Sequence, residues 1–321
     1  MLKKEKSIVK AESLAFILKP SYFEEKIEPL KKYLKNLSDK QSFKVASDYI
    51  SKLSQFRSSL DRPQELIFKK RFQELILPIA HESHFCQYAF EKPRGYAGDF
   101  VMMDMIWGFF QKTYPHKETK LGKKISQLTF EMQNCKANVY RAYELAKWIK
   151  KPKFLKIASI GCGSAIELSI LLKKSPMCFL NKKIDLYDQD PQALLKAKQG
   201  FNETTLTLIQ GNVLKSILTL NTDYDLIYLS GLLDYFDTPT SQRMMKYLIQ
   251  HLKPKGTLIL INAHPLNPTR FWMEYVADWY LCYKEMINFV SIIENQEQLL
   301  QGFQVQKDPF GVYQYLIATK I

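Results

Sequence analysis

Paired glycines occur at two places in the chain where the neighbouring residues could bind a ligand. In SIGCGSAIEL (159–168), Gly161 and Gly163 follow a β-branched run and precede an amphipathic run. This pattern predicts a strand that turns directly into a helix, where backbone N–H groups are exposed and missing side chains let a ligand approach. Ile166 stands where the dinucleotide fingerprint G-x-G-x-x-G needs its third glycine, which argues against a bound pyrophosphate.

Polar or small residues follow three further β-branched runs. Asp188 ends KIDLYD and Gln189 follows it, Asn212 and Val213 come after LTLIQ, and Ser230 ends YDLIYLS and is followed by Gly231. The carboxyl ends of parallel strands share one edge of a sheet, so we expect these residues near the glycine turn. The Asp188 carboxylate can accept hydrogen bonds from both hydroxyls of a ribose, and Asn212 with the Val213 backbone can contact an adenine. Asp190, followed by Pro191, is instead predicted to cap the next helix.

The second glycine-bearing segment is KPRGYAGDF (92–100), which interrupts a region of helical periodicity. Arg94 can bind a carboxylate, Asp99 can accept an ammonium group, and Tyr96 can contact a substrate. We expect this loop to form part of a lid over the strand ends. The alternative is that Arg94 and Asp99 form a structural ion pair between the two halves of the chain.

The apolar periodicity divides the chain into two predicted domains. Residues 1–150 predict an all-helical N-terminal domain that acts as a lid, with Leu66, Phe68, Phe72, Leu75, Ile76 and Ile79 on one face of a helix. One long helix is predicted over 125–151. In residues 151–321 strands and helices alternate five times and two strands follow, which predicts an α/β fold with a doubly wound, seven-stranded, Rossmann-like sheet.

An insert at about 264–290 is expected to complete a substrate pocket. His264, Asn267 and Arg270 follow the fifth strand, and Tyr235 follows the fourth. The aromatic residues of the insert recur at helical spacing and could line an apolar slot or pack in a core. They are Trp272, Tyr275, Trp279, Tyr280 and Tyr283. A hydroxyl or amine acceptor would need a general base, for which His264 is the first candidate and Asp234 the second.

Composition limits the classes of function. The net charge is +14, and residues 1–57 hold 13 Lys and Arg against 7 Asp and Glu. Because lysines alternate with glutamates, we interpret this as a solvated face, with a nucleic-acid or membrane surface as the alternative. The five cysteines are scattered and the histidines lack metal-ligand spacing, so we expect no disulfide framework and no metal. The apolar run 14–18 is too short for a signal peptide and no run could span a membrane, which predicts a cytoplasmic protein.

Taken together, residues 150–321 resemble the class I S-adenosylmethionine-dependent methyltransferases. Ser159 and Asn212 depart from the acidic residues common in that family, while Glu167 matches an acid of its first helix, where it could also serve only to cap that helix. Two segments, 92–107 and 262–285, resemble signature segments of bacterial methyltransferases of 3-hydroxypalmitic acid methyl ester biosynthesis, a quorum-sensing signal. This narrower resemblance covers about residues 65–321.

The resemblance implies S-adenosylmethionine as cofactor and methyl transfer to the carboxylate of a small acidic or fatty-acyl 3-hydroxy acid. The implied cofactor-binding set is Gly161, Gly163, Asp188, Gln189, Asn212, Val213, Ser230, Gly231, Arg94 and Asp99. The implied substrate set is Tyr96, Tyr235, Asn267, Arg270, Tyr275, Trp279 and Tyr283. The alternatives are a methyltransferase on RNA or protein and a non-catalytic module that binds the cofactor or a partner. The sequence leaves the oligomeric state open.

Overall fold

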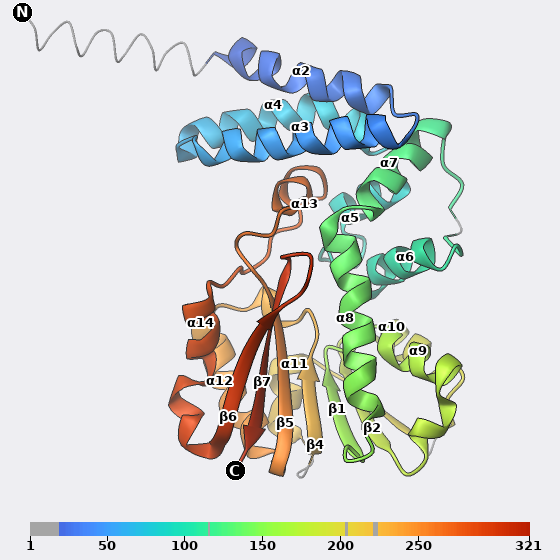
Figure 1. The fold of residues 1–321 in the computed structure, drawn as a ribbon, viewed down its shortest axis with the longest axis vertical. Coiled ribbons are helices and arrows are strands. Elements are labelled where there is room, and N and C mark those ends of the chain that lie inside the picture. The colour runs from blue at the N-terminus through green and yellow to red at the C-terminus, as the bar shows by residue number, and fades with distance from the viewer. Residues whose placement is uncertain (1–18, 115, 203–204, 221–223) are drawn as a thin grey trace, which may run out of the picture. The chain divides into compact units, whose positions relative to one another are not determined.

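The computed structural model describes residues 19–114, 116–202, 205–220 and 224–321, and the chain divides into two compact units (Figure 1). The helical unit comprises Met1–Gly98, Pro115–Met132 and Thr269–Tyr280, and the sheet unit comprises Asp99–Tyr114, Gln133–Pro268 and Leu281–Ile321. This division does not coincide with the predicted boundary at residue 150. Part of the predicted helical domain belongs to the sheet unit, and part of the predicted insert belongs to the helical unit.

Six α-helices lie in the described residues of the helical unit. They are α2 (Pro20–Lys35), α3 (Lys40–Ser58), α4 (Arg62–Ala80), α5 (His84–Glu91), α7 (Lys120–Phe130) and α13 (Arg270–Val276). Reciprocal caps start two of them, between Asp39 and Ser42 for α3 and between Asp61 and Gln64 for α4. Each cap satisfies N–H groups that have no partner within the helix, and so fixes where the helix begins.

Aromatic side chains form much of the core of the helical unit. Phe68 and Phe72 of α4 pack against Phe271 and Tyr275 of α13, and the ring centroids of Phe271 and Tyr275 lie 4.4 Å apart. Such pairs contribute about 0.5–1.5 kcal/mol beyond their burial. The prediction that Leu66 shares this face is wrong, because Leu66 is 63% exposed. Two residues correspond to about 200° around a helix, so Leu66 and Phe68 point in opposite directions.

The single helix predicted over 125–151 is also wrong. Helix α7 ends at Phe130, and α8 (Gln133–Lys150) begins three residues later. Neither glycine nor proline stands at the break, but the Met132 N–H donates to the Thr129 carbonyl, which tightens the last turn. The break falls where the chain passes from the helical unit to the sheet unit, so the two helices belong to different cores.

The sheet unit contains a seven-stranded sheet in the order β3-β2-β1-β4-β5-β7-β6. Its strands are β1 (Lys156–Ile160), β2 (Lys183–Asp188), β3 (Leu206–Gln210), β4 (Tyr224–Leu229), β5 (Leu252–Ala263), β6 (Leu300–Lys307) and β7 (Tyr313–Lys320). Strands β1 to β5 are parallel, and β7 runs antiparallel between β5 and β6. The predicted seven-stranded, Rossmann-like α/β fold is confirmed.

The strand order reverses between β1 and β4. Ile160 at the end of β1 lies opposite Tyr187 of β2 on one side and Leu229 of β4 on the other, so the three strands end level. In open α/β sheets, ligands bind at the carboxyl ends of the strands where the order reverses. We call the residues that follow these strands, 161–164, 188–190 and 230–235, the switch-point site.

Helices cover both faces of the sheet (Figure 1). Side chains alternate along β1, so that Ile157 packs in one core with α8, α9 and α10, and Ala158 packs in the other with α12 and α14. The helices of the sheet unit are α6 (Phe100–Phe110), α8, α9 (Ile166–Lys174), α10 (Pro191–Ala197), α11 (Val213–Ser216), α12 (Thr238–Gln250) and α14 (Met286–Val290). Short 3₁₀ helices are η1 (Pro176–Phe179), η2 (Ile217–Thr219), η3 (Leu233–Tyr235) and η4 (Ser291–Leu299).

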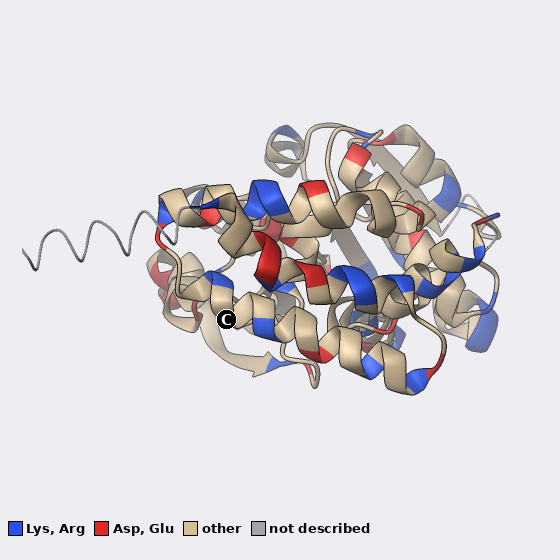
Figure 2. Cartoon of the chain, turned by 90° about the horizontal axis from the view of Figure 1, so that it is seen from above, with Lys and Arg blue, Asp and Glu red and all other residues tan. Residues whose placement is uncertain are grey.

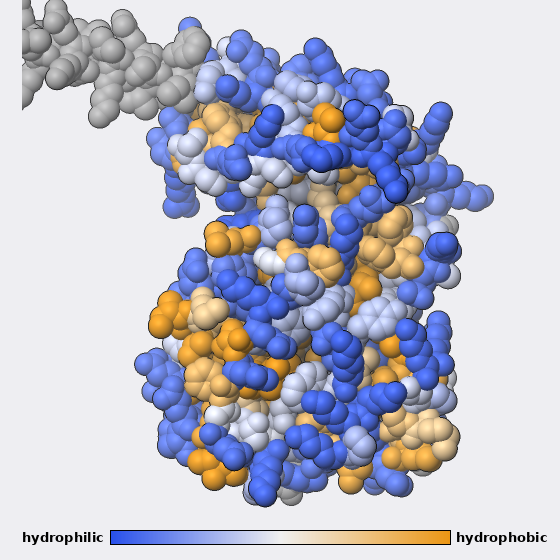
Figure 3. Space-filling model, in the orientation of Figure 1, coloured by the Kyte–Doolittle hydropathy of each residue, from blue (hydrophilic) through white to orange (hydrophobic). Residues whose placement is uncertain are grey.

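Charges of both signs are interspersed along the helices seen from above (Figure 2). Lys31 pairs with Glu28 at 3.2 Å and Lys44 with Asp48 at 2.6 Å. This distribution agrees with a solvated face, although the basic residues before position 19 lie outside the described residues. Exposed apolar side chains gather over α14, where Ile287 is one of them (Figure 3). Among the described helices, none is long and apolar enough to cross a membrane.

Candidate functional site

The turn after β1 has the backbone geometry that its glycines predict. Gly161 and Gly163 have φ angles of +69° and +53°, in the region that favours glycine. The N–H groups of Gly161 and Cys162 donate to the Tyr187 carbonyl at 2.8 and 3.0 Å, which holds the turn against the end of β2. A Cβ on Gly161 would lie 3.2 Å from the Leu232 side chain in the turn after β4. The turns after β1, β2 and β4 are therefore in close contact.

Helix α6, which begins at the end of the predicted lid segment 92–100, packs on this turn. A Cβ on Gly163 would lie 3.5 Å from the Cβ of Phe100, the first residue of α6. The Ser164 hydroxyl donates to Asp104 Oδ1 at 2.6 Å, and Lys196 Nζ lies 2.6 Å from Asp104 Oδ2. Because these partners are far apart in the chain, local spacing could not single out Asp104. The helix covers one side of the switch-point site.

Asp99 has a structural task at the start of α6. Its carboxylate accepts the Met102 N–H at 2.9 Å as the helix cap, and the residue is 1% exposed. Asp99 directly precedes Phe100 in the chain and therefore lies close to the Gly163 turn. Arg94 and Tyr96 belong to the helical unit. The ligand contacts expected of these three residues remain predictions.

Asp188 is the last residue of β2, as predicted. Its carboxylate accepts the Gly163 N–H at 2.8 Å and the Asp190 N–H at 2.9 Å, so it supports the glycine turn. Burial raises the pKa of Asp188, and these N–H groups partly oppose that rise. A carboxylate has further lone pairs that can accept ligand hydroxyls. Gln189 is exposed beside it, and Asp190 caps α10 by accepting the Gln192 N–H at 2.9 Å, which confirms its predicted role.

The turns after β3 and β4 carry the other predicted cofactor contacts. Asn212 Oδ1 accepts the Leu214 N–H at 3.0 Å and caps α11, so its amide oxygen already has a partner. Val213 is half-buried next to it, as is Ser230 after β4. Gly231 has a φ of +79°, and a Cβ there would lie 3.0 Å from a guanidinium nitrogen of Arg141. A side chain at this position would require the guanidinium to shift by a few tenths of an ångström.

Glu167 lies inside the sheet unit rather than at its surface. Its Oε1 accepts the Tyr228 hydroxyl at 2.7 Å, and both residues are buried. Burial raises the pKa of Glu167, while the hydrogen bond from Tyr228 lowers it to a smaller extent. The interpretation that Glu167 only caps and solubilises its helix is therefore wrong. It holds the start of α9 to β4 just below the glycine turn.

Asp234, the second candidate base, is engaged with the backbone. Its Oδ1 accepts the Ala263 N–H at 2.6 Å, and the residue is buried. Lys284 Nζ donates to the carbonyl oxygens of Leu233 and Phe236 at 3.0 and 2.8 Å, which holds the turn after β4 in place. Burial raises the pKa of Asp234 and lowers that of Lys284. These contacts give Asp234 a structural task, and the role of base remains a prediction.

His264, the first candidate base, follows β5 as predicted. Its Nδ1 accepts the Leu266 N–H at 3.2 Å, and burial lowers the pKa of the imidazole. A neutral imidazole that accepts through Nδ1 carries its proton on Nε2. In this state His264 offers a ligand a donor rather than a base. Its own N–H donates to the Val312 carbonyl at 2.8 Å, which fixes the residue beside the start of β7.

The predicted insert does not form one aromatic helix. Helix α13 ends at Val276, and Asp278 adopts a φ of +47° that breaks the helical spacing. Arg270, Tyr275 and Trp279 belong to the helical unit, where Tyr275 is fully buried among phenylalanines. Tyr96 belongs to the helical unit as well, and the sheet unit contains the other three substrate candidates, Tyr235, Asn267 and Tyr283. The structure thus assigns the predicted substrate residues to two units, and their substrate contacts remain predictions.

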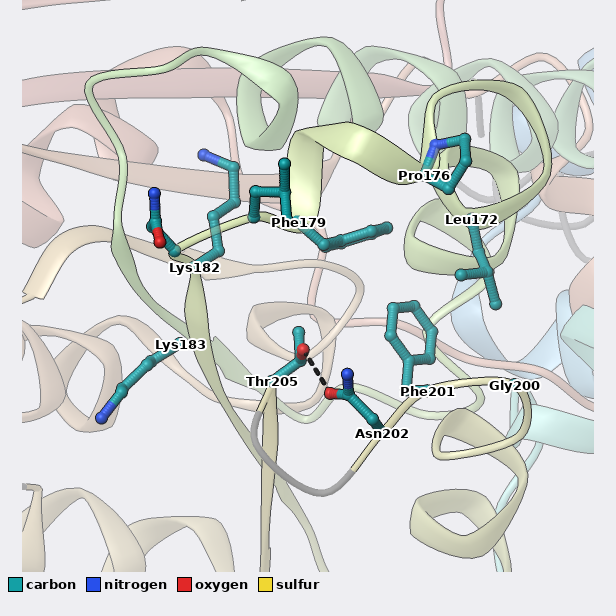
Figure 4. Close-up of a pocket in the computed structure, with 11 residues that line it drawn as sticks. Leu172, Pro176, Phe179, Lys182, Lys183, Gly200, Phe201, Asn202 and Thr205 are labelled. Atoms are coloured by element: carbon teal, nitrogen blue, oxygen red, sulfur yellow. Dashed lines mark hydrogen bonds between the residues drawn. The ribbon is translucent and has the colours of Figure 1, made fainter.

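A pocket of about 410 Å³ lies at the opposite end of the sheet (Figure 4). Phe179 and Phe201 line it together with Lys183, the first residue of β2, whereas Asp188 is the last. The hydroxyl of Thr205 donates to Asn202 at its rim, at 2.7 Å. No predicted site residue lines this pocket.

Within the described ranges no group of His, Cys, Asp and Glu could hold a metal ion, and all five cysteines are free thiols.

Comparison with known proteins gives one family match. Residues 158–258 match the family described as a methyltransferase domain, and a search of curated protein sequences found no match. A solved structure of a possible exported protein from Bordetella parapertussis has a TM-score of 0.54 and 16% identity, over 94% of this chain and 97% of that chain.

Two more distant structures are methyltransferases. Human N-acetylserotonin methyltransferase in complex with S-adenosylmethionine gives a TM-score of 0.43 and 16% identity, over 68% of this chain and 66% of that chain. Magnesium protoporphyrin IX methyltransferase from Synechocystis, with bound S-adenosylmethionine, gives a TM-score of 0.44 and 13% identity, over 69% of this chain and 96% of that chain. The family match begins in β1 and ends in β5, so it contains the whole switch-point site. The match to a methyltransferase domain thus lies within the sheet unit.

Proposed function

We propose that this protein transfers a methyl group from S-adenosylmethionine to the carboxylate of a small acidic or fatty-acyl 3-hydroxy acid. The proposal combines the methyltransferase family match with the state of the residues at the switch-point site. Its substrate part also draws on the resemblance of segments 92–107 and 262–285 to the methyl ester enzymes. The observation that favours an acid acceptor is the engagement of both candidate bases.

The residues of the switch-point site fit the cofactor. Gly161 and Gly163 leave the turn after β1 without side chains, and Asp188 presents a carboxylate at the end of the neighbouring strand. In this arrangement Asp188 would accept the ribose hydroxyls, the backbone after β3 would contact the adenine, and Gly231 would leave space beside the amino-acid part. The bound cofactor supplies an electrophilic methyl group.

A carboxylate acceptor agrees with the hydrogen bonds of the two candidate bases. A hydroxyl or amine would need a general base, but Nδ1 of His264 accepts the Leu266 N–H and Oδ1 of Asp234 accepts the Ala263 N–H. A carboxylate is nucleophilic at pH 7 without such help. The protein then has to orient the acid and exclude water, and orientation alone can contribute about 7–11 kcal/mol. The donor on His264 Nε2 would help to orient the acid.

Calorimetric titration with S-adenosylmethionine and S-adenosylhomocysteine tests the cofactor site. Wild-type protein should bind both, and Asp188→Ala should weaken binding at least tenfold. Asp39→Ala is the matched control, because Asp39 is an exposed aspartate that caps α3 in the helical unit and lies outside the switch-point site. Folded wild-type protein that binds neither compound would refute the proposal and favour a module that binds a partner.

The acceptor is tested by incubating the protein with S-adenosylmethionine and 3-hydroxy fatty acids of 8 to 16 carbons. Mass spectrometry should detect a base-labile methyl ester, and the matching 3-hydroxy alcohol should give no product. Transfer of radioactive methyl groups to RNA or protein in a lysate, with no ester from any acid, would favour the alternative macromolecular substrate. The interspersed charges of the helical unit argue against an RNA surface there (Figure 2).

A further inference from the structure

The buried face of α8 changes character along its length. Leu145, Ala146 and Ile149 near its end pack in the core with β1, as expected for a helix that covers a sheet (Figure 1). Towards its start, beside the buried Cys135 and Ala137, three buried positions are polar: Asn134, Asn138 and Arg141 occur at spacings of four and three residues and therefore share a face. A buried face that turns polar towards a ligand-binding edge needs a reason, because burying polar groups is costly.

Arg141 is the residue of this face that lies against the switch-point site. It is 8% exposed, and its guanidinium would meet a Cβ on Gly231 at 3.0 Å, in the turn after β4. The guanidinium carbon also lies 4.7 Å from the centre of the Tyr313 ring. Gly161, in the turn after β1, lies against Leu232, the neighbour of Gly231. The Arg141 guanidinium thus lies against Gly231, the residue next to the contact between the two turns.

The guanidinium lacks the partner that a buried arginine normally has. Among the described residues its hydrogen bond is to the sulfur of Met103, at 3.9 Å, and it forms no ion pair with a carboxylate. A guanidinium carries five N–H donors in a planar fork that suits a carboxylate. Most of these donors are left for a ligand.

Two buried carboxylates lie near enough to affect Arg141 without contacting it. Burial works against its charge, while Tyr313, Asp234 and Glu167 are among the groups that raise its pKa. Glu167 accepts the Tyr228 hydroxyl and Asp234 accepts the Ala263 N–H, so each carboxylate is directed to another partner. Their negative charges favour the guanidinium cation, and their hydrogen bonds to other groups leave its donors open.

We infer that Arg141 is the carboxylate-binding residue of this site. Resting on the proposed function, this inference gives the site a residue that recognises an acid, and two ligands could supply the carboxylate. One is the amino-acid part of the cofactor, and the other is the acid that accepts the methyl group. Asn138, one turn away on the same face, and Tyr313 would border the bound group.

The test compares wild type with Arg141→Met and Arg141→Lys by calorimetry. Arg243→Met is the matched control, because Arg243 is an exposed arginine on α12 of the same unit. Three probes are titrated. S-adenosylhomocysteine carries the amino-acid carboxylate, 5′-methylthioadenosine lacks the amino-acid part, and 3-hydroxydecanoate, with its methyl ester as control, is added to protein saturated with S-adenosylhomocysteine. Circular dichroism checks that each variant is folded.

Each source of the carboxylate has its own signature. If Arg141 holds the cofactor, Arg141→Met weakens the binding of S-adenosylhomocysteine at least tenfold and leaves the affinity for 5′-methylthioadenosine unchanged. If it holds the acceptor, S-adenosylhomocysteine binding persists and 3-hydroxydecanoate binding falls at least tenfold, while the methyl ester is unaffected. Arg141→Lys should bind the affected carboxylate probe several-fold less tightly than wild type, because an ammonium cannot make the paired contact.

Unchanged binding of all probes by folded Arg141→Met would overturn the inference. Should that variant fail to fold, wild-type affinity in Arg141→Lys for both carboxylate probes would overturn it instead. Failure of the proposed function looks different, since wild-type protein would then bind neither S-adenosylhomocysteine nor S-adenosylmethionine.

Discussion

Buried charges are satisfied differently in the two units. In the helical unit Glu274 is 0% exposed and lies between two arginines, 3.0 Å from Arg57 Nη2 and 2.6 Å from Arg270 Nε. In the sheet unit Arg141 has no carboxylate partner among the described residues, and Asp188 accepts backbone N–H groups. The buried Glu274 is thus held by opposite charges in the helical unit, whereas at the switch-point site buried charges bind backbone groups or, at Arg141, no carboxylate. The predictions below test that contrast.

The largest effect is expected from Glu274→Ala. Removing one partner of a buried ion pair costs about 3–5 kcal/mol, because the remaining charges lose their compensation. Urea unfolding should show this loss, while the affinity for S-adenosylhomocysteine stays at the wild-type value. Glu28→Ala breaks an exposed pair with Lys31 and should cost less than about 1 kcal/mol. Equal losses in the two variants would contradict the contrast.

Gly231→Ala should act on both stability and binding. Its φ of +79° is strained for any residue with a side chain, at about 1–3 kcal/mol, and the new Cβ would displace the Arg141 guanidinium. We expect a lower melting temperature and at least tenfold weaker binding of S-adenosylhomocysteine. Gly302→Ala in β6 is the control, since a Cβ there meets nothing within 4 Å. Tight binding by folded Gly231→Ala would show that this turn does not contact the ligand.

Asp99 allows its two roles to be separated. Asp99→Ala removes the cap of α6 and should cost about 1 kcal/mol. Asp99→Ser keeps a capping oxygen, so it should retain most of that stability. If Asp99 also accepts the ammonium group of the cofactor, Asp99→Ser should bind S-adenosylmethionine less tightly than wild type at equal stability. Wild-type affinity in Asp99→Ser would leave Asp99 as a cap alone.

The smallest effect concerns the pH dependence of stability. Burial by itself raises the pKa of Asp278, but hydrogen bonds from Lys92 and Lys69 outweigh it and lower the pKa below its usual value. Such a carboxyl stabilises the fold above its unfolded pKa of about 3.9 and loses this contribution as pH falls towards the folded value. The difference in free energy of unfolding between wild type and Asp278→Asn should therefore be constant from about pH 7 to 5 and shrink below about pH 4.

The change in the contribution of Asp278 should stay under about 1 kcal/mol, because its side chain is about one-third exposed.

The stability contribution of Glu167 in the sheet unit should depend on pH in the opposite way. Burial raises its pKa, so its contribution to stability grows as pH falls through the folded pKa towards the unfolded value. Urea titrations of Glu167→Gln against wild type would check this sign. A contribution from Glu167 that falls on acidification would contradict a raised pKa in the folded protein.

Much of the fold could be predicted because its signals are local. Strands β1 to β5 each contain a short apolar run, and Gly161, Gly163 and Asp188 stand at strand ends that the alternation of elements places together. The cap at Asp190 follows from its neighbours in the same way. The break between α7 and α8 has no such signal, because it results from the attachment of the two helices to different units.

The sequence by itself determined the α/β class, the glycine turn and the position of Asp188, since these depend on residues close together in the chain. Tertiary structure alone decided that α6 packs on the glycine turn, that α13 belongs to the helical unit, and that Arg141 faces Gly231. In the sequence Arg141 is one arginine in an amphipathic helix, equally suited to solvent. Its burial and its open donors arise only when the turn after β4 and the start of β7, more than 80 residues further on, fold against it.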